Sequence, residues 1–277
     1  MSNKKNVGQQ GLFDHKEYTV KKSNPRQLPL DFIFTLDNIT DASMLVAWNA
    51  GWKVGIRSSA ASLDSDVRKK VVDYIERWQW RFQITFIDNE YTNYNHKHHL
   101  EVVKRFTPKY CTVMDVMTEK QCAKDNIKYH SLKQILEWAE ELSQHAQNVI
   151  VIPKYDCLDK IPEKFMLGYS IPTSHGGTPL PLSRFKGRRV HLLGGSWKNQ
   201  LAALEELGDS VVSIDNNYIH KVAQYAQFTF ANGEMGSLSD IKQVHMNAVN
   251  PFYICFTISL GNIAAKVNEL YKERKDS

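Results

Sequence analysis

Acidic residues end several short apolar runs of this sequence. Asp88 ends the run at 82–88 (FQITFID), Asp115 the run at 110–115 (YCTVMD) and Asp215 the run at 210–215 (SVVSID). A carboxylate can act as a nucleophile or as a general acid or base, and two of them can together break a glycosidic bond. One such acid is often only the cap of a following helix. Several at equivalent positions of successive strands indicate a shared site.

Small and polar residues occupy the same place in three further runs. Residues 148–153 (NVIVIP) are followed by Lys154 and Asp156, and the runs at 165–171 (FMLGYSI) and 190–195 (VHLLGG) contain glycine. Glycine lets the backbone approach a ligand where a side chain would clash. The last two runs supply six candidate substrate-binding residues: Gly168, Tyr169, Ser170, Gly194, Gly195 and Ser196.

These apolar runs alternate with helical patterns. The strongest pattern predicts a helix over 131–146, where apolar residues recur every three or four positions. A second helix is expected over 197–207, closed by Gly208, and a shorter one over 98–106. Strands alternating with helices indicate βαβ units and a parallel sheet. With about seven or eight strands in 277 residues, we predict an α/β fold, a single-domain (β/α)8 barrel whose strand ends converge on one face.

Three regions are expected along the chain. Residues 1–30 form a basic arm, residues 31–237 the barrel, and residues 238–277 a helical segment that either closes the barrel or forms a homodimer surface. A basic arm suits a nucleic-acid backbone, although ordinary surface charge gives the same pattern. Two local basic runs have the same potential: one consists of Lys104, Arg105 and Lys109, and the other of Arg184, Lys186, Arg188 and Arg189.

The composition excludes several classes of protein. Hydrophobic residues make up 42% and charged residues 23%, which is typical of globular proteins and excludes a mainly disordered chain. No apolar stretch reaches the roughly 20 residues needed to cross a bilayer, and the amino terminus lacks the apolar region of a secretory signal. The four cysteines are scattered, and His96, His98 and His99 have no partner ligands at metal-binding spacing. The sequence therefore predicts a reduced, cytoplasmic protein without a metal or other cofactor.

The segment at 188–217 (RRVHLLGGSWKNQLAALEELGDSVVSIDNN) resembles the late barrel segment of the queuine-type tRNA-guanine transglycosylases. In that family a strand ending in a glycine-containing motif precedes a helix and then a strand that ends at the nucleophilic aspartate. FIDN, VMDV and MLGYS occur upstream in the family's order of motifs. The zinc site of the tRNA enzymes needs a cysteine-rich cluster, whereas residues 226–277 contain only Cys255 and His245. The chain is therefore most similar to the zinc-free phage and bacterial enzymes that insert 7-deazaguanine bases into DNA.

This resemblance implies a function and a role for each acid. The expected reaction replaces guanine in nucleic acid, with DNA favoured over tRNA, by a 7-deazaguanine base through a covalent Asp-glycosyl intermediate. Asp215 corresponds to the nucleophile, Asp88 to the general acid and base, and Asp115 to the residue that recognises the base. Further expected contacts are Lys154 and His175 with the substrate, and His220 and Lys221 with the nucleic acid.

Two other functions remain open from the sequence. The first is a non-catalytic barrel that binds nucleic acid or serves as an accessory subunit, as a member of this superfamily would become if it lost a catalytic acid. A Gly-Gly-Ser motif before a helix is also typical of phosphate cradles, which favours a sugar-phosphate-binding barrel enzyme. The presence of both Asp88 and Asp215 favours catalysis over the first alternative, and the lack of a Schiff-base lysine or metal set disfavours the second.

Overall fold

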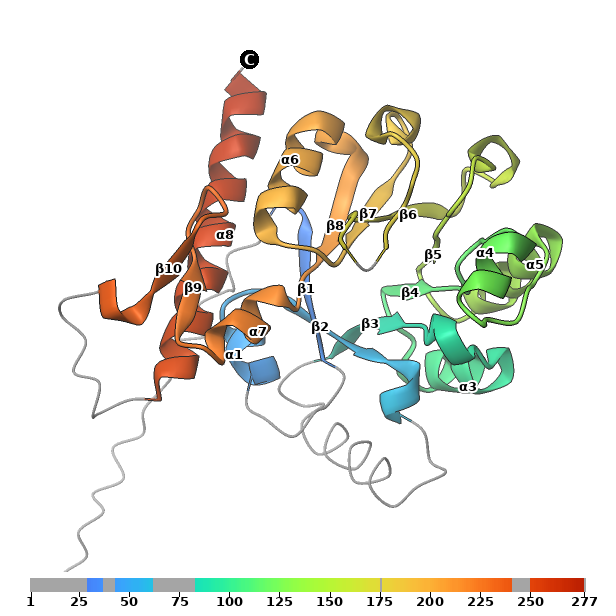
Figure 1. The fold of residues 1–277 in the computed structure, drawn as a ribbon, viewed down its shortest axis with the longest axis horizontal. Coiled ribbons are helices and arrows are strands. Elements are labelled where there is room, and N and C mark those ends of the chain that lie inside the picture. Colours follow the sequence, from blue (N-terminus) through green and yellow to red (C-terminus); the bar gives the residue numbers. More distant parts are fainter. Residues whose placement is uncertain (1–28, 37–42, 62–82, 175, 241–249, 277) are drawn as a thin grey trace, which may run out of the picture.

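Eight parallel strands close into a barrel in the computed structural model, which describes residues 29–36, 43–61, 83–174, 176–240 and 250–276 (Figure 1). Each strand pairs with its neighbour in the sequence, and the first strand closes the barrel by pairing with the last. The predicted (β/α)8 fold is therefore confirmed. The barrel strands are β1 (Asp31–Leu36), β2 (Lys53–Arg57), β3 (Ile84–Asp88), β4 (Tyr110–Thr112), β5 (Asn148–Val151), β6 (Met166–Ser170), β7 (Val190–Leu193) and β8 (Val211–Asp215).

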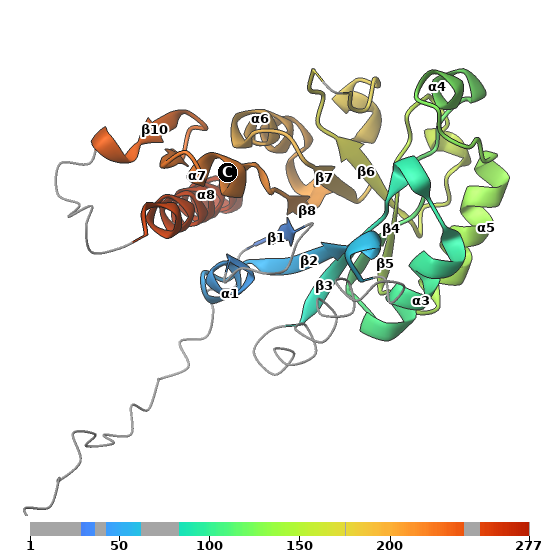
Figure 2. The same ribbon diagram turned by 60° about the horizontal axis from the view of Figure 1, so that its bottom comes forward.

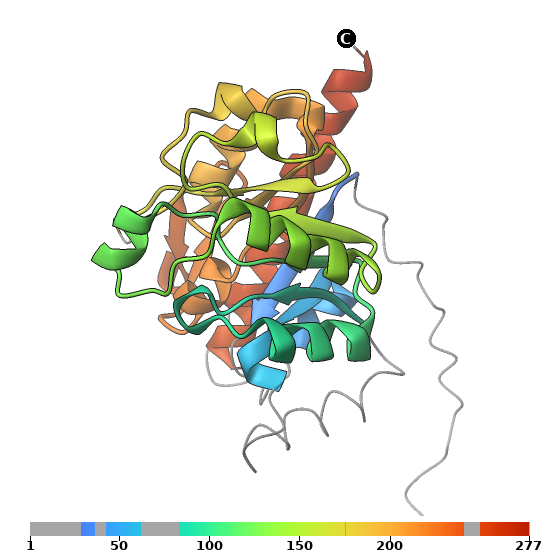
Figure 3. The same ribbon diagram turned by 90° about the vertical axis from the view of Figure 1, so that its right-hand side faces the viewer.

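Helices cover the outside of the barrel, as the views in Figures 1 and 2 show. On one side, α3 (His96–Phe106) and α5 (Leu132–Ser143) lie side by side (Figure 3), joined by a hydrogen bond between His96 and Glu141. On the other side, α8 (Pro251–Asp276) packs against α7 (Tyr218–Ala223). The other α-helices of the described residues are α1 (Ser43–Asn49), α4 (Glu119–Lys124) and α6 (Trp197–Leu207).

Local capping sets the ends of the predicted helices. Ser131 caps α5 by accepting a hydrogen bond from the Gln134 N–H, and Gly208 follows α6 with a positive φ of 60°. Helix α3 begins two residues before the predicted start because Asn95 caps it.

The region after the barrel differs in part from the prediction. A short antiparallel hairpin of β9 (Gln227–Thr229) and β10 (Met235–Ser237) follows α7 and was not predicted. The long helix occupies 251–276, and residues 241–249 of the predicted helical segment lie outside the described residues.

The inside of the barrel is filled by side chains rather than open. A buried interior cluster contains Ile33, Phe86, Tyr110, Ile150, Ile152 and Met166. A polar pair lies in the same interior, where His191 Nδ1 and Ser213 Oγ are 2.8 Å apart. Burial lowers the pKa of His191 to about 3, so the imidazole is neutral at physiological pH.

Gly168 packs the interior more tightly than any larger residue could. A Cβ at this position would lie 2.6 Å from Ile152 Cγ1 and 2.9 Å from Leu193 Cδ1. We therefore expect Gly168→Ala to lower the free energy of unfolding by about 1–3 kcal/mol through overpacking. Urea denaturation checks this, with Gly261→Ala as the matched control.

Gly261 lies within α8 with open space around its Cβ position, so its substitution is expected to raise stability by about 0.5–1 kcal/mol. Equal effects of the two substitutions would contradict the packing argument.

Candidate functional site

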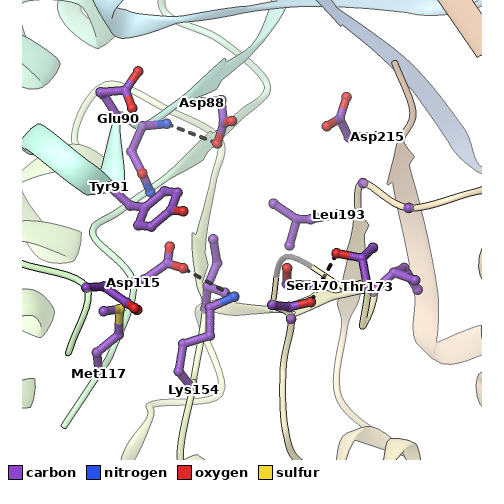
Figure 4. Close-up of a pocket in the computed structure, with 18 of the residues that line it drawn as sticks. Asp88, Glu90, Tyr91, Asp115, Met117, Lys154, Ser170, Thr173, Leu193 and Asp215 are labelled. Atoms are coloured by element: carbon purple, nitrogen blue, oxygen red, sulfur yellow. Dashed lines mark hydrogen bonds and ion pairs between the residues drawn. The ribbon is translucent and has the colours of Figure 1, made fainter. Parts of the chain in front are cut away.

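A cavity of about 530 Å³ lies at the carboxyl ends of the barrel strands, within the size range of small-molecule sites (Figure 4). Its wall includes the last residues of β2, β3, β6, β7 and β8, together with loops that follow β4 and β5. Asp88, Asp115 and Asp215 all line it. The three acids thus lie on one face of the barrel, as the sequence predicted. Figure 4 shows Asp88 and Asp215 on different sides of the cavity.

Asp215 is held at both its side chain and its backbone. The carboxylate Oδ1 accepts a hydrogen bond from Thr35 Oγ1 at 2.5 Å, and only 8% of the residue is exposed. The backbone carbonyl accepts hydrogen bonds from the Gly194 N–H at 3.2 Å and from Gln200 Nε2 at 2.7 Å. These bonds orient one carboxylate oxygen and fix the end of β8 against the end of β7.

The buried side chain of Gln200 connects three chain segments beneath the cavity. Its Nε2 donates to the carbonyls of Gly194 and Asp215, each at 2.7 Å, and its Oε1 accepts from Asn216 Nδ2 at 2.7 Å. Every polar atom of this amide is thus satisfied although the residue is 0% exposed. The signal in the sequence is a glutamine on the inward face of an amphipathic helix just after Gly-Gly-Ser.

Asp88 is partly buried and has three polar contacts. Its Oδ1 accepts hydrogen bonds from Thr112 Oγ1 and from the Asn89 N–H, each at 3.0 Å, and its Oδ2 lies 3.8 Å from Arg57 Nε. Burial raises the pKa of the carboxyl group to about 6, although the Arg57 charge and the Thr112 hydrogen bond act to lower it. A carboxyl group with this pKa can hold or release a proton near neutral pH, as a general acid and base must.

Asp115 forms an ion pair with Lys154 in a mostly buried part of the cavity. Asp115 Oδ2 and Lys154 Nζ are 3.3 Å apart, and the side chains are 9% and 14% exposed. Burial raises the pKa of Asp115, whereas the Lys154 charge and the Asn89 side chain oppose that rise. Asn89 is itself fixed because its Nδ2 donates to the Val113 carbonyl at 2.6 Å. The pair supplies an acceptor and a donor side by side.

The structure brings most of the predicted substrate-binding residues to the cavity, but not all of them. Ser170, Gly194, Gly195 and Lys154 line it together with the three acids. Gly168 lies one layer deeper, and Ser196 caps α6 by accepting a hydrogen bond from the Asn199 N–H. Contrary to expectation, Tyr169 faces the outer core, where its ring packs edge-on against Phe185. Adjacent residues of a strand face opposite sides, so Tyr169 points away from the cavity that Ser170 lines. His175 lies outside the described residues.

The predicted basic contacts divide into residues near the cavity and residues far from it. Lys221 lines the cavity. Arg188 and Arg189 directly precede β7, and Arg189 bonds to the Asn148 side chain at the start of β5, so both lie at the opposite end of the barrel. They donate to the Pro162 and Lys164 carbonyls, among others, and brace loops there.

Three more of the predicted basic contacts, Arg184, Lys186 and His220, do not line the cavity. Arg184 pairs with Asp156 at 2.8 Å, and Lys186 follows it in the same exposed loop. His220 packs among Phe34, Phe252 and Phe256 under α8 and bonds to Ser43, so its ring is part of the packing on the outside of the barrel. The structure therefore places these side chains outside the cavity lining, and their contact with nucleic acid stays a prediction.

Several residues of the cavity were not predicted from the sequence. Arg57 was missed because β2 was not recognised as a strand, although it ends in a charged residue as β3 and β8 do. Asn89 directly follows Asp88, and Tyr91 is 44% exposed at the cavity wall. Further polar residues of the lining are Glu90, Gln121, Lys124, Asp125 and Asn217.

The histidines at 96–99 have contacts of their own. His96 stacks on Trp138 and bonds to Glu141 and Tyr94, and His99 is buried against the Thr112 carbonyl. Within the described residues, no group of three or more His, Cys, Asp or Glu side chains is placed to hold a metal ion. The four cysteines are buried as free thiols. No helix of the described part of the chain has both the length and the apolar character of a membrane span.

The closed barrel with a polar, acid-lined cavity at the strand carboxyl ends defines a (β/α)8 protein with one candidate site on the face where barrel proteins bind ligands. The chain belongs to the family of unknown function DUF6610, whose match covers residues 47–268. No curated protein matches the sequence. Among solved structures, the chain is similar to the YdjI aldolase from Escherichia coli K12, with 12% sequence identity and a TM-score of 0.47 over 87% of this chain and 91% of that one.

Proposed function

We propose that this protein is a base-exchange transglycosylase that replaces guanine in nucleic acid, with DNA favoured, by a 7-deazaguanine base. The observation that carries the proposal is the convergence of Asp88, Asp115 and Asp215 on one cavity, in the chain order that the sequence resemblance implies. Enzymes that break glycosidic bonds place two carboxylates on either side of the bond, and those that retain the configuration of the sugar use one of them as the nucleophile.

The chemistry uses Asp215 and Asp88 in two balanced steps. In the first, the Asp215 carboxylate attacks C1′ of the nucleoside, and the bond from C1′ to guanine breaks while the carboxyl proton of Asp88 passes to the leaving base. This step leaves a glycosyl ester on Asp215 and a carboxylate on Asp88. In the second, the Asp88 carboxylate removes a proton from the incoming base, whose nitrogen attacks C1′ and releases Asp215.

The contacts of the two acids suit these roles. Thr35 holds Asp215 Oδ1, which fixes the orientation of the carboxylate toward the sugar. Thr112 and the Asn89 N–H hold Asp88 Oδ1, whereas Asp88 Oδ2 has the more distant Arg57 as its partner. Asp115 can accept hydrogen bonds from N1–H and from the exocyclic amine of a guanine-type base with its two oxygens.

The position of the cavity requires that the target base leave its stack. Asp115 is only 7% exposed and Asp215 only 8%. A base within a duplex cannot reach them, so the target nucleotide must be flipped out of the duplex. Tyr91 on the cavity wall can stack against a neighbouring base, and Lys221 can contact the backbone. A phosphate cradle at Gly194 is less well supported, since its N–H already donates to the Asp215 carbonyl.

The proposal is tested by incubating the protein with duplex DNA or bulk tRNA and labelled 7-cyano-7-deazaguanine. We expect label in the DNA and none with the Asp215→Asn variant. Label in tRNA alone would support base exchange but show that the nucleic-acid substrate is tRNA rather than DNA. DNA binding without incorporation of any base would contradict exchange and favour the accessory-subunit alternative.

A further inference from the structure

Lys154 occupies a position in the cavity that the two chemical steps leave without a role. Its backbone is fixed on both sides, because its N–H donates to the Val116 carbonyl at 2.8 Å and its carbonyl accepts from Gln121 Nε2 at 2.9 Å. Its side chain is only 14% exposed, and its ammonium group lies 3.3 Å from Asp115 Oδ2. Figure 4 shows it reaching into the cavity beside Asp115 and opposite Ser170. A mostly buried ammonium needs a charged or hydrogen-bonding partner, and the partner of Lys154 is the carboxylate proposed to contact the base.

The edge of a guanine-type base dictates what such a group would meet. N1–H and the exocyclic amine are donors and pair with a carboxylate. The next group along the edge is the 6-oxygen, an acceptor, and the substituent on C7 of a 7-deazaguanine lies beside it. A lysine ammonium has three donors and no acceptor. If Asp115 holds the donors, Lys154 is placed to meet the 6-oxygen and the 7-substituent.

We propose that Lys154 is the specificity-determining residue for the incoming base, which admits a 7-substituent that accepts hydrogen bonds, such as a nitrile or a carboxylate, and excludes one that carries an ammonium group. The inference rests on the proposed function and names the substrate class of the same site. It follows from the position of the Lys154 charge next to the base-recognising carboxylate.

Two acids of the cavity, Asp115 and Glu90, are engaged by other groups. Asp115, the counter-charge of Lys154, is engaged with the base edge once a base is bound. Glu90 accepts hydrogen bonds from Ser59 and Thr92, which direct its carboxylate toward neighbouring loops. A second ammonium beside Lys154 would therefore experience repulsion at short range in a mostly buried site, where charges interact more strongly than in water.

Lys154 also favours the ionised form of Asp115, so its removal should weaken the binding of every base. That common effect cancels in the ratio of two affinities, because Asp115 contacts the same edge of each base. The informative quantity is thus the ratio between the dissociation constants of a 7-aminomethyl and a 7-cyano base.

Calorimetric titration of free bases measures this ratio without a nucleic acid. We expect the intact protein to bind 7-cyano- and 7-carboxy-7-deazaguanine at least about tenfold more tightly than the 7-aminomethyl base. Lys154→Met should bring the ratio of aminomethyl to cyano dissociation constants close to one, and Lys154→Arg, which keeps the charge, should preserve it. Lys104→Met removes an exposed lysine of α3 that does not line the cavity and should leave the ratio unchanged. Thermal melting of each variant verifies that it is folded.

The outcomes separate the two proposals. Tighter binding of the aminomethyl base by the intact protein, or an unchanged ratio in folded Lys154→Met, would overturn the role of Lys154 while base exchange stands. Failure of the intact protein to bind any 7-deazaguanine would remove both proposals together.

Discussion

Asp215→Asn is expected to reduce the rate of base exchange by about a thousandfold or more while leaving the barrel folded. An amide has no charge with which to attack C1′, so no glycosyl ester can form. The fold should persist because asparagine is nearly isosteric and its amide oxygen can still accept the hydrogen bond from Thr35. The measurement is the exchange rate and the melting temperature of the same preparation.

The control is another aspartate that follows a barrel strand. Asp156 follows β5, but its carboxylate pairs with Arg184 in an exposed loop, so Asp156→Asn should exchange base at the normal rate. Asp215 is not needed to cap α7. The neighbouring residue Asn216 does so, because its Oδ1 accepts hydrogen bonds from the Tyr218 and Ile219 N–H groups. An Asp215→Asn protein that melts earlier yet exchanges base normally would remove Asp215 from the mechanism.

Asp88→Asn is expected to slow exchange by about a hundredfold to ten-thousandfold and to abolish its pH optimum. The intact protein should exchange base fastest near pH 6, because the pKa of Asp88 is about 6 and the residue acts as an acid in one step and as a base in the other. Below this pH the carboxylate that the second step needs becomes scarce, and above it the proton that the first step needs becomes scarce. The pH dependence of single-turnover exchange measures this, and an unchanged optimum in the variant would assign the optimum to another group.

Asp88→Asn is expected to lower activity but to raise stability at high pH. The measurement of stability therefore serves as the control for the measurement of activity. The pKa of Asp88 is about 6 in the folded protein and near 3.8 when unperturbed, so the folded state binds the proton more tightly. The stability from this site is complete below about pH 4 and is lost as pH rises through 6, by up to about 3 kcal/mol. Asp88→Asn has no such loss and should be more stable than the intact protein at pH 8, but not at pH 4. Urea denaturation at both values tests this, and equal stability at pH 8 would show that burial does not disfavour the charge.

The sequence predicted the fold and the acids of the site, since both depend on local patterns. Helix α6 occupies the predicted residues because its apolar period and its terminal glycine agree. The strand-end acids were found because parallel strands bring their carboxyl ends to one face. The side of a strand on which a residue points was harder to predict, as Tyr169 shows, because a shift of one residue reverses it.

Charge runs gave less information than strand ends. Arg188 and Arg189 belong to a basic run, but nothing in that run indicates that it precedes a strand at the far end of the barrel. Arg57 is an isolated arginine in a region without a clear period, and its place beside Asp88 depends on the pairing of β2 with β3, a contact between distant parts of the sequence.

The amide of Gln200 has a consequence for redesign of the protein. Since this one side chain ties the carbonyl of Asp215 to that of Gly194, the position of Asp215 is set from α6, on the β7–β8 side of the barrel. Asp115 and Lys154 are positioned by the loops after β4 and β5, through bonds that Gln200 does not share. The two parts of the cavity can therefore be altered separately. An engineer could exchange the loops that contact the base to accept a different ligand and keep Asp215 in place, whereas a change at Gln200 would displace it whatever the ligand.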